Sequence, residues 1–279
     1  MPPRQNSSQA KNGAGWRTAL AYALYSAGIL AVFCCGVFLY FRADRFLAED
    51  PRFRLAEPSS GGSDGSPIEI EGIKYASRAR VESVFAADYG RSLYLIPLAE
   101  RRRSLLAIDW VQDASVVRLW PNRLKVMITE RRPVAFVHLP GEQAGSEVAL
   151  IDAEGVLLGL PPRAGFNLPV LTGIRREQSL QARRQRVAAA LRLLKELEEL
   201  AEGISEIDVS ELDNLKVVQA AGGRGLLLEL GNRNFRSRVQ NFLTHYPEIE
   251  RRLPEATSFD LRLDDRITAR EGGRRSGKS

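Results

Sequence analysis

One uninterrupted apolar run dominates the pattern of hydrophobic and polar positions along the chain. Residues 18–41 form a stretch of 24 residues without a charge. At about 1.5 Å per residue a helix of this length spans about 36 Å, enough to cross a hydrocarbon core of about 30 Å. Aromatic residues lie at or near its ends, as in membrane helices; they are Trp16, Tyr22, Tyr25 and Tyr40. The pattern predicts a transmembrane helix over residues 18–41. A cleaved signal peptide, the alternative, has an apolar core of only about 7–15 residues.

The segments that flank this run are polar. Residues 1–17 carry three basic residues and no acidic one. Because arginines also follow the run, the usual excess of positive charge on the cytoplasmic side does not decide the orientation. A short, acid-free tail before a large downstream part favours a cytoplasmic N-terminus. Residues 42–67 lead away from the membrane and end in a stretch rich in Gly, Ser and Pro, which is typical of a flexible linker.

Strand and helix periods alternate directly after the linker. Alternating side chains predict a strand that begins at Ile68. Ser77 is suited to cap a first helix that ends near Gly90, and Pro97 is suited to open a second helix. A short extended segment is expected between the two helices, over residues 93–96.

A β-hairpin follows these helices. The β-branched stretch 111–119 leads into a Pro-Asn turn signal at 121–122. From Leu124 onward apolar and polar residues alternate, so one face of the second strand is expected to be buried. Pro133 cannot donate a ladder hydrogen bond, and it is expected to close this strand or to lie on an edge. The predicted order over residues 68–137 is therefore β-α-α-β-β.

The remaining part, residues 138–270, is predicted to contain mostly strands with two amphipathic helices. Strands are expected over residues 148–151, 156–158, 204–209, 215–220, 226–230, 257–263 and 266–270. Helical spacing of apolar residues predicts one helix over residues 179–202 and another that begins near Phe235 and is ended by Pro247. The glycines at 222–225 lack the Gly-Lys-Ser/Thr ending of a phosphate loop, so a turn is expected there.

Charge is concentrated in the two tails. The formal net charge is +6, but residues 18–269 carry 33 basic and 33 acidic residues. A neutral folded part argues against a nucleic-acid-binding protein, which carries its basic surface on the fold. The basic triplet at 101–103 is expected to face solvent rather than anionic lipid headgroups.

No constellation for catalysis or metal binding is visible. Cys34 and Cys35 both lie in the apolar run, so the polar remainder has no disulfide framework and no thiolate nucleophile. His138 and His245 are expected to be structural or surface residues, because no metal-ligand spacing accompanies them. The Gly-x-Ser-x-Gly elbow is absent. We therefore expect no cofactor, no metal and no small-molecule substrate. The acidic residues scattered along the chain leave open a pair of carboxylates that cleaves glycans, because such a pair is defined by its separation in space.

Several short motifs are more specific than a generic hairpin. They are Gly72, Trp110-Val111, Ala114-Ser-Val116, Arg118, Trp120-Pro121, Leu124, Glu130-Arg-x-Pro-Val-Ala135, Leu168-Pro-x-x-x-Gly173, residues 208–214 and Phe259-Asp-Leu-Arg262. Together they resemble the FtsQ/DivIB family of bacterial cell-division proteins. The resemblance implies an α+β protein with a single transmembrane helix, a β-α-α-β-β POTRA domain over 68–137, and a C-terminal mixed or antiparallel β-domain with two covering helices over 138–270. A flexible tail, 271–279, would follow.

The resemblance also implies a function. It describes a non-enzymatic protein of the bacterial inner membrane whose main domains are periplasmic and which links early and late division proteins at the septum. The implied partners are the small bitopic proteins FtsB and FtsL, recruited by the C-terminal region, with other divisome contacts made by the POTRA domain. A sheet edge can bind such partners because its unpaired N–H and C=O groups accept an added strand.

The last predicted strand ends the fold in sequence, and its edge is expected to be exposed. The candidate partner-binding residues are Arg262, Leu263, Arg266, Ile267 and Ala269. Arg262 would meet a partner carboxylate, and the backbone of residues 266–269 would supply the ladder. The alternative is that this hairpin only completes the sheet. Two other functions remain open, a POTRA-containing export or assembly factor and a membrane-anchored cell-wall enzyme.

Overall fold

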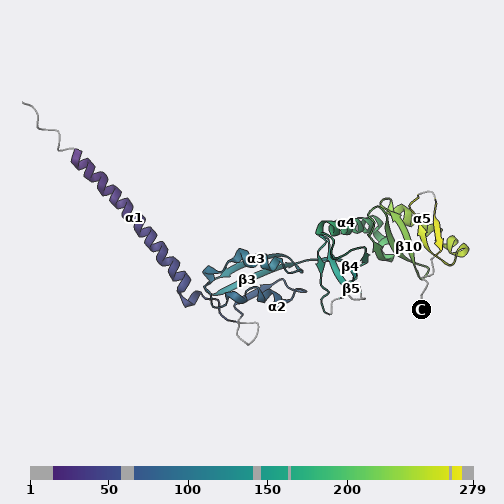
Figure 1. Cartoon of the computed structure of the whole chain (residues 1–279), viewed down its shortest axis with the longest axis horizontal. Coiled ribbons are helices and arrows are strands. Elements are labelled where there is room, and N and C mark those ends of the chain that lie inside the picture. The colour runs from purple at the N-terminus through teal and green to yellow at the C-terminus, as the bar shows by residue number, and fades with distance from the viewer. Residues whose placement is uncertain (1–14, 58–65, 141–145, 163–164, 264–265, 272–279) are drawn as a thin grey trace, which may run out of the picture. The chain divides into compact units, whose positions relative to one another are not determined.

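The computed structural model describes residues 15–57, 66–140, 146–162, 165–263 and 266–271. Figure 1 shows its elements in chain order. The chain divides into a first unit, Met1–Ile70 with Val84–Arg101 and Val116–Val126, and a second unit, Glu71–Ser83 with Arg102–Ser115 and Met127–Ser279. The expectations for residues 1–14, for the glycine- and serine-rich part of the linker and for residues 272–279 lie outside the described residues.

The apolar run forms α1 (Gly15–Glu49), which is longer than the predicted span (Figure 1). Within the described ranges it is the one helix long and apolar enough to cross a membrane. Its large apolar side chains are exposed along its length, from Leu20 to Phe46. Residues 42–49, expected in the linker, are therefore helical. A 3-10 turn, η1 (Pro51–Phe53), follows, and the Asp50 carboxylate accepts the N–H of Arg52.

A three-stranded sheet comes next, in the order β1-β3-β2. Its strands are β1 (Ile68–Glu71), β2 (Val111–Leu119) and β3 (Arg123–Glu130), and the helices α2 (Arg78–Ser83) and α3 (Leu98–Leu106) lie between β1 and β2 in the chain. The predicted β-α-α-β-β order is confirmed. The Ser77 hydroxyl accepts the N–H of Arg80, as a helix cap does.

Two local expectations in this region were wrong: the first helix, α2, ends at Ser83 and not near Gly90, and residues 93–96 are not an extended segment. Residues 93–96 include a 3-10 turn, η4 (Leu93–Leu95), because the Ser92 hydroxyl accepts the N–H of Tyr94 and caps it. A second such turn, η3 (Ala86–Asp88), places Asp88 in the interior.

The basic triplet 101–103 is also not simply solvated. The Arg101 guanidinium donates to both carboxylate oxygens of Asp88, at 2.5 and 2.8 Å, and Asp88 is fully buried. This hydrogen bond raises the pKa of Arg101. A buried carboxylate without a positively charged partner would destabilise the fold. The ion pair therefore keeps the Arg101 side chain next to Asp88. Arg102 donates to the Asp113 carboxylate and to the carbonyl of Ala114.

The second sheet has nine strands, in the order β12-β11-β10-β9-β8-β7-β4-β5-β6. The strands are β4 (Pro133–Pro140), β5 (Ser146–Asp152), β6 (Leu157–Leu158), β7 (Val170–Thr172), β8 (Ile204–Asp208), β9 (Leu215–Ala221), β10 (Arg224–Gly231), β11 (Ala256–Asp260) and β12 (Thr268–Glu271). The pairs β4–β7, β7–β8 and β10–β11 are parallel and the other pairs antiparallel, so the sheet is mixed. Residues 133–137, expected at the end of the first domain, lie in β4, and β3 closes before Pro133.

Helices α4 (Leu180–Leu197) and α5 (Phe235–Arg252) accompany this sheet, and a 3-10 segment, η5 (Glu198–Gly203), follows α4 (Figure 1). Apolar residues from both helices and from the strands form one buried core. The expected turn at the glycines 222–225 joins β9 to β10, with Gly222 and Gly223 at positive φ.

Pro247 lies inside α5 and does not end it, contrary to the sequence expectation. A proline in a helix removes one backbone donor and costs about 3 kcal/mol. The helix nevertheless continues, because Ile249 packs against the core and its carbonyl accepts the N–H of Leu253 at 2.8 Å. Tertiary packing of the last turn therefore outweighs the local preference.

Candidate functional site

Strand β12 is the end strand of the large sheet. It pairs antiparallel with β11, with Ala269 opposite Phe259 and Thr268 opposite Asp260. Among the strands that the structure describes, none pairs with the other side of β12. Its outer backbone groups are therefore those an added strand would use.

Strand β11, with which β12 pairs, is fixed by its pairing with β10 and by aromatic contacts to α5. It runs parallel to β10, and the N–H of Leu261 extends the contact to the Glu229 carbonyl at 2.9 Å. The Phe259 ring, 1% exposed, lies 4.9 Å from the Phe242 ring and 6.4 Å from the Tyr246 ring of α5, measured between centroids. An aromatic cluster thus fixes β11 against the helix.

The five predicted partner-binding residues fall in two described segments, one after β11 and one at the start of β12. Arg262 and Leu263 follow β11 and are exposed, Leu263 to 54%. Arg266 and Ile267 precede β12, and Ala269 lies within it. The observed strand thus begins two residues later than the predicted backbone ladder, 266–269. Ile267 and Ala269 are partly buried and pack against the core, so they turn part of their side chains inward.

The guanidinium of Arg262 already has an internal partner. It donates to both carboxylate oxygens of Asp260, at 2.9 and 2.6 Å, and lies 3.8 Å from the carboxylate of Glu229. The hydrogen bond to Asp260 is the main cause that raises the pKa of Arg262. Glu229 is itself buried and accepts a hydrogen bond from the side-chain amide of Asn214. A partner carboxylate would have to compete with Asp260 for this arginine.

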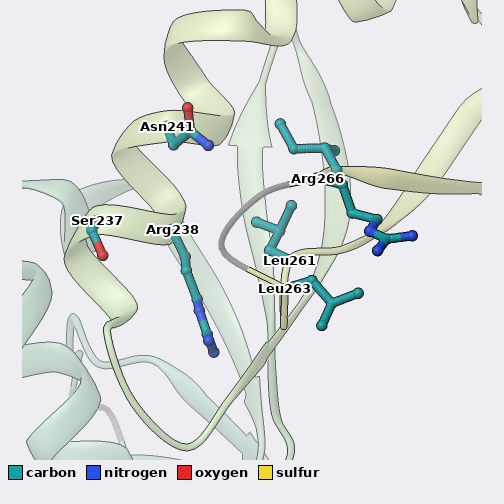
Figure 2. A pocket seen from close by; sticks show the side chains of 7 residues that line it. Ser237, Arg238, Asn241, Leu261, Leu263 and Arg266 are labelled. Carbon is teal, nitrogen blue, oxygen red and sulfur yellow. The ribbon is translucent and has the colours of Figure 1, made fainter.

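Two adjoining pockets lie between α5 and the segment that enters β12. One has a volume of about 360 Å³ and is lined by Ser237, Arg238, Asn241, Leu261, Leu263, Arg266 and Ile267. The other, of about 450 Å³, shares Asn241, Arg266 and Ile267 with it and extends to His245, Glu248, Ile249 and Arg252. Figure 2 shows α5 on one side of the first pocket and the segment around Leu261 and Leu263 on the other. A groove therefore borders the start of the edge strand.

The α5 residues of this groove were missed in the sequence. Arg238 is 7% exposed and donates to the Leu230 carbonyl at 2.6 Å. Its position was readable, because it stands three residues after Phe235 and four before Phe242, on the buried face of the helix. The position of Ser237 and Asn241 opposite Leu263 and Arg266 had no signal in the sequence, because it depends on how distant segments pack.

The residues considered for other chemistry are dispersed. The described part of the chain holds no group of three His, Cys, Asp or Glu residues that could bind a metal. His138 lies exposed in β4, and His245 lies exposed on α5 with its Nδ1 atom 2.8 Å from the Asn241 carbonyl. The histidines are surface residues, as expected.

The motif residues of the hairpin have structural roles. One carboxylate oxygen of Glu130 accepts three successive backbone N–H groups, from Lys74, Tyr75 and Ala76, at 2.7–2.8 Å. The Trp110 indole donates to the Gly159 carbonyl, at 2.9 Å.

Arg131, the next motif residue, makes an ion pair within the second unit. It forms an ion pair with the Asp152 carboxylate at 2.8 Å, and Asp152 is fully buried. These motif residues therefore stabilise the fold.

Comparison with known proteins yields two family matches that lie side by side in the chain. The family described as POTRA domain, FtsQ-type, matches residues 66–131, and the family described as Cell division protein FtsQ/DivIB, C-terminal, matches residues 142–262. Both fall on the folded parts described above.

Similar individual proteins carry the same description. A cell division protein FtsQ of Koribacter versatilis (strain Ellin345) is 35% identical over 222 residues, which is 77% of this chain and 60% of that protein. One from Myxococcus fulvus is 29% identical over 62% of this chain and 57% of its own length. One from Syntrophotalea carbinolica is 23% identical over 95% of this chain and 88% of its own length. The chain thus spans less than two thirds of the first two relatives.

Proposed function

The chain belongs to the FtsQ/DivIB family of cell-division proteins, and we propose that it is a non-enzymatic, membrane-anchored member of the division machinery that recruits partner proteins through its last strand. The family is one of non-enzymatic division proteins. As in the sequence expectation, the protein links early and late division components during septum formation.

We propose the following membrane arrangement. Helix α1 crosses the inner membrane once, residues 1–17 are cytoplasmic, and the POTRA domain (68–137) and the β-domain (138–270) are periplasmic and concentrated at the septum. What supports this is one apolar helix near the N-terminus of the described residues, followed by two folded parts that match the FtsQ-type POTRA family and the FtsQ/DivIB C-terminal family.

The single observation that carries the partner-binding proposal is the position of β12 at the end of the sheet. An FtsB-like segment, alone or with its FtsL-like companion, adds a strand to this edge, and backbone hydrogen bonds supply most of the affinity. Residues just before the added strand fill the groove beside Arg266 and Ile267. Leu263, which is exposed, adds apolar contact at the rim.

In this proposal Arg262 contributes less to partner binding than an arginine without an internal carboxylate partner would. Asp260 already accepts two hydrogen bonds from Arg262. A carboxylate of the partner therefore adds to the binding free energy only the difference between its own pairing with Arg262 and the pairing with Asp260. Arg262 then orients the partner and contributes less to the affinity than the ladder does.

A binding experiment tests the edge-strand proposal. Ile267→Pro removes one backbone donor at the entry to β12, outside the register with β11, so the fold should survive while the affinity of the fragment 66–271 for an FtsB-like peptide falls at least tenfold. Leu160→Pro, at a half-exposed leucine outside every described strand, is the matched control and should bind normally. Equal affinity of the two folded variants would refute the proposal.

A further inference from the structure

The end of α1 is attached to the first folded unit by specific contacts. The Ser92 hydroxyl donates to the Leu47 carbonyl at 2.6 Å, and the Arg54 guanidinium donates to the Glu49 carbonyl at 3.3 Å. The Tyr94 hydroxyl bonds to the Asp44 carboxylate, which raises the pKa of Tyr94. The last two turns of the helix are thus held by η1 and η4 of the same unit.

A row of aromatic rings extends this attachment to the tip of the β2–β3 hairpin. The Phe46 ring of α1 lies 5.6 Å from the Phe53 ring, and Phe53 lies 5.5 Å from the Trp120 ring, in edge-to-face geometry. Phe46 and Trp120 remain exposed to 55% and 51%. Leu95, in η4, is 50% exposed in the same unit. Large apolar side chains therefore remain uncovered around the end of α1.

The depth of this row follows from the length of the helix. Phe46 stands five residues beyond Phe41, the last residue of the charge-free run. Five residues rise about 7.5 Å, and the headgroup region adds about 5–8 Å on each side of the hydrocarbon core. If the helix tilts to fit its length of about 36 Å into about 30 Å, Phe46 moves closer to the core. Trp120 is two ring contacts away from Phe46 and thus within reach of the same layer.

We propose that the Trp120 tip of the β2–β3 hairpin, together with Phe46, Phe53 and Leu95, lies in the outer headgroup layer of the membrane that α1 crosses. The inference rests on the membrane arrangement proposed above. It adds a second point of lipid contact, far along the chain from the helix.

Lipid is the occupant that the surroundings favour. The aromatic row is continuous with the membrane helix through Phe46, so covering it requires no additional component. Tryptophan prefers the interface, where its ring is partly apolar and partly wet. Residues 42–54 carry four basic and three acidic side chains, so the contact depends on the aromatic rings more than on anionic lipid.

The test uses the full-length chain in vesicles that contain brominated lipids, which quench nearby tryptophan fluorescence. The chain has three tryptophans, so Trp16→Phe leaves Trp110 and Trp120, and adding Trp120→Phe leaves Trp110, which is buried. The difference between the two variants reports on Trp120. We expect it to be quenched, and more strongly by bromine near the headgroup than by bromine near the methyl end. Phe53→Ala in the Trp16→Phe background removes the ring under Trp120 and should reduce this quenching.

Three outcomes are distinct. Quenching that is lost with Trp120 supports the inference. If the Trp16→Phe variant floats with the vesicles but both variants are quenched equally, the membrane anchor stands and this inference is wrong. If the protein does not float at all, the proposed membrane arrangement fails and the inference fails with it. Partner binding by the C-terminal edge should be unchanged by Trp120→Phe in either case.

Discussion

The three hydrogen bonds to Glu130 allow a quantitative prediction about the motif that begins at the end of β3. Its carboxylate accepts the N–H groups of Lys74, Tyr75 and Ala76, in the turn that follows β1. This turn places Tyr75 against Trp110 and Phe166, at 5.2 and 5.3 Å between ring centroids. Removal of the carboxylate should therefore loosen the turn and its aromatic cluster together.

The magnitude follows from the type of bond. Hydrogen bonds to a charged group contribute about 1.5–3 kcal/mol each, so three bonds set a ceiling of about 5–9 kcal/mol. Glu130 is only partly buried and Lys74 is exposed, so water can replace part of what is lost. We expect Glu130→Ala to lower the free energy of unfolding by about 2–4 kcal/mol, and Glu130→Gln, which keeps a neutral acceptor, by about 1–2 kcal/mol.

Urea unfolding of the fragment 66–271, followed by tryptophan fluorescence, measures this loss, provided that the slope with denaturant is unchanged. Glu69→Gln is the matched control. Glu69 is exposed and lies 3.5 Å from the Lys125 ammonium, so its loss should cost at most about 1 kcal/mol. If Glu130→Ala unfolds at the same urea concentration as Glu69→Gln, the three hydrogen bonds do not stabilise the fold and the reasoning is refuted.

Further predictions concern the edge of the large sheet. Phe259→Ala should reduce the free energy of unfolding by about 3–5 kcal/mol, because it leaves a cavity beneath β11; a loss below that of a surface substitution in the same unfolding assay would contradict this. Asp260→Asn should release Arg262 from its carboxylate partner and increase the affinity for an acidic peptide, and reduced affinity of a folded variant would argue against it. Burial is the main cause that raises the pKa of Tyr246, so its contribution to stability is present below the unfolded-state pKa near 10 and is lost as the pH rises through the folded-state value. Tyr246→Phe should therefore flatten the decline in stability above about pH 10, and identical alkaline profiles would refute the assignment.

The types of the elements were largely readable from the sequence, because they depend on local periodicity. The charge-free run predicted α1, alternation predicted β1 and β3, and Ser77 marked the start of α2. These signals come from neighbours in the chain, so they survive without knowledge of the fold. Where packing overrides them, as at Pro247, the prediction failed.

The order of the strands and the pairing of charged side chains were decided by the tertiary structure alone. The sequence by itself determined that a last hairpin exists, but not that β11 runs parallel to β10 and leaves β12 at the end of the sheet. It determined that Arg262 and Arg101 are charged, but not that Asp260 and Asp88 neutralise them. Pairing of strands and of charges depends on which distant segments come into contact, and the periodicity of a chain does not predict those contacts.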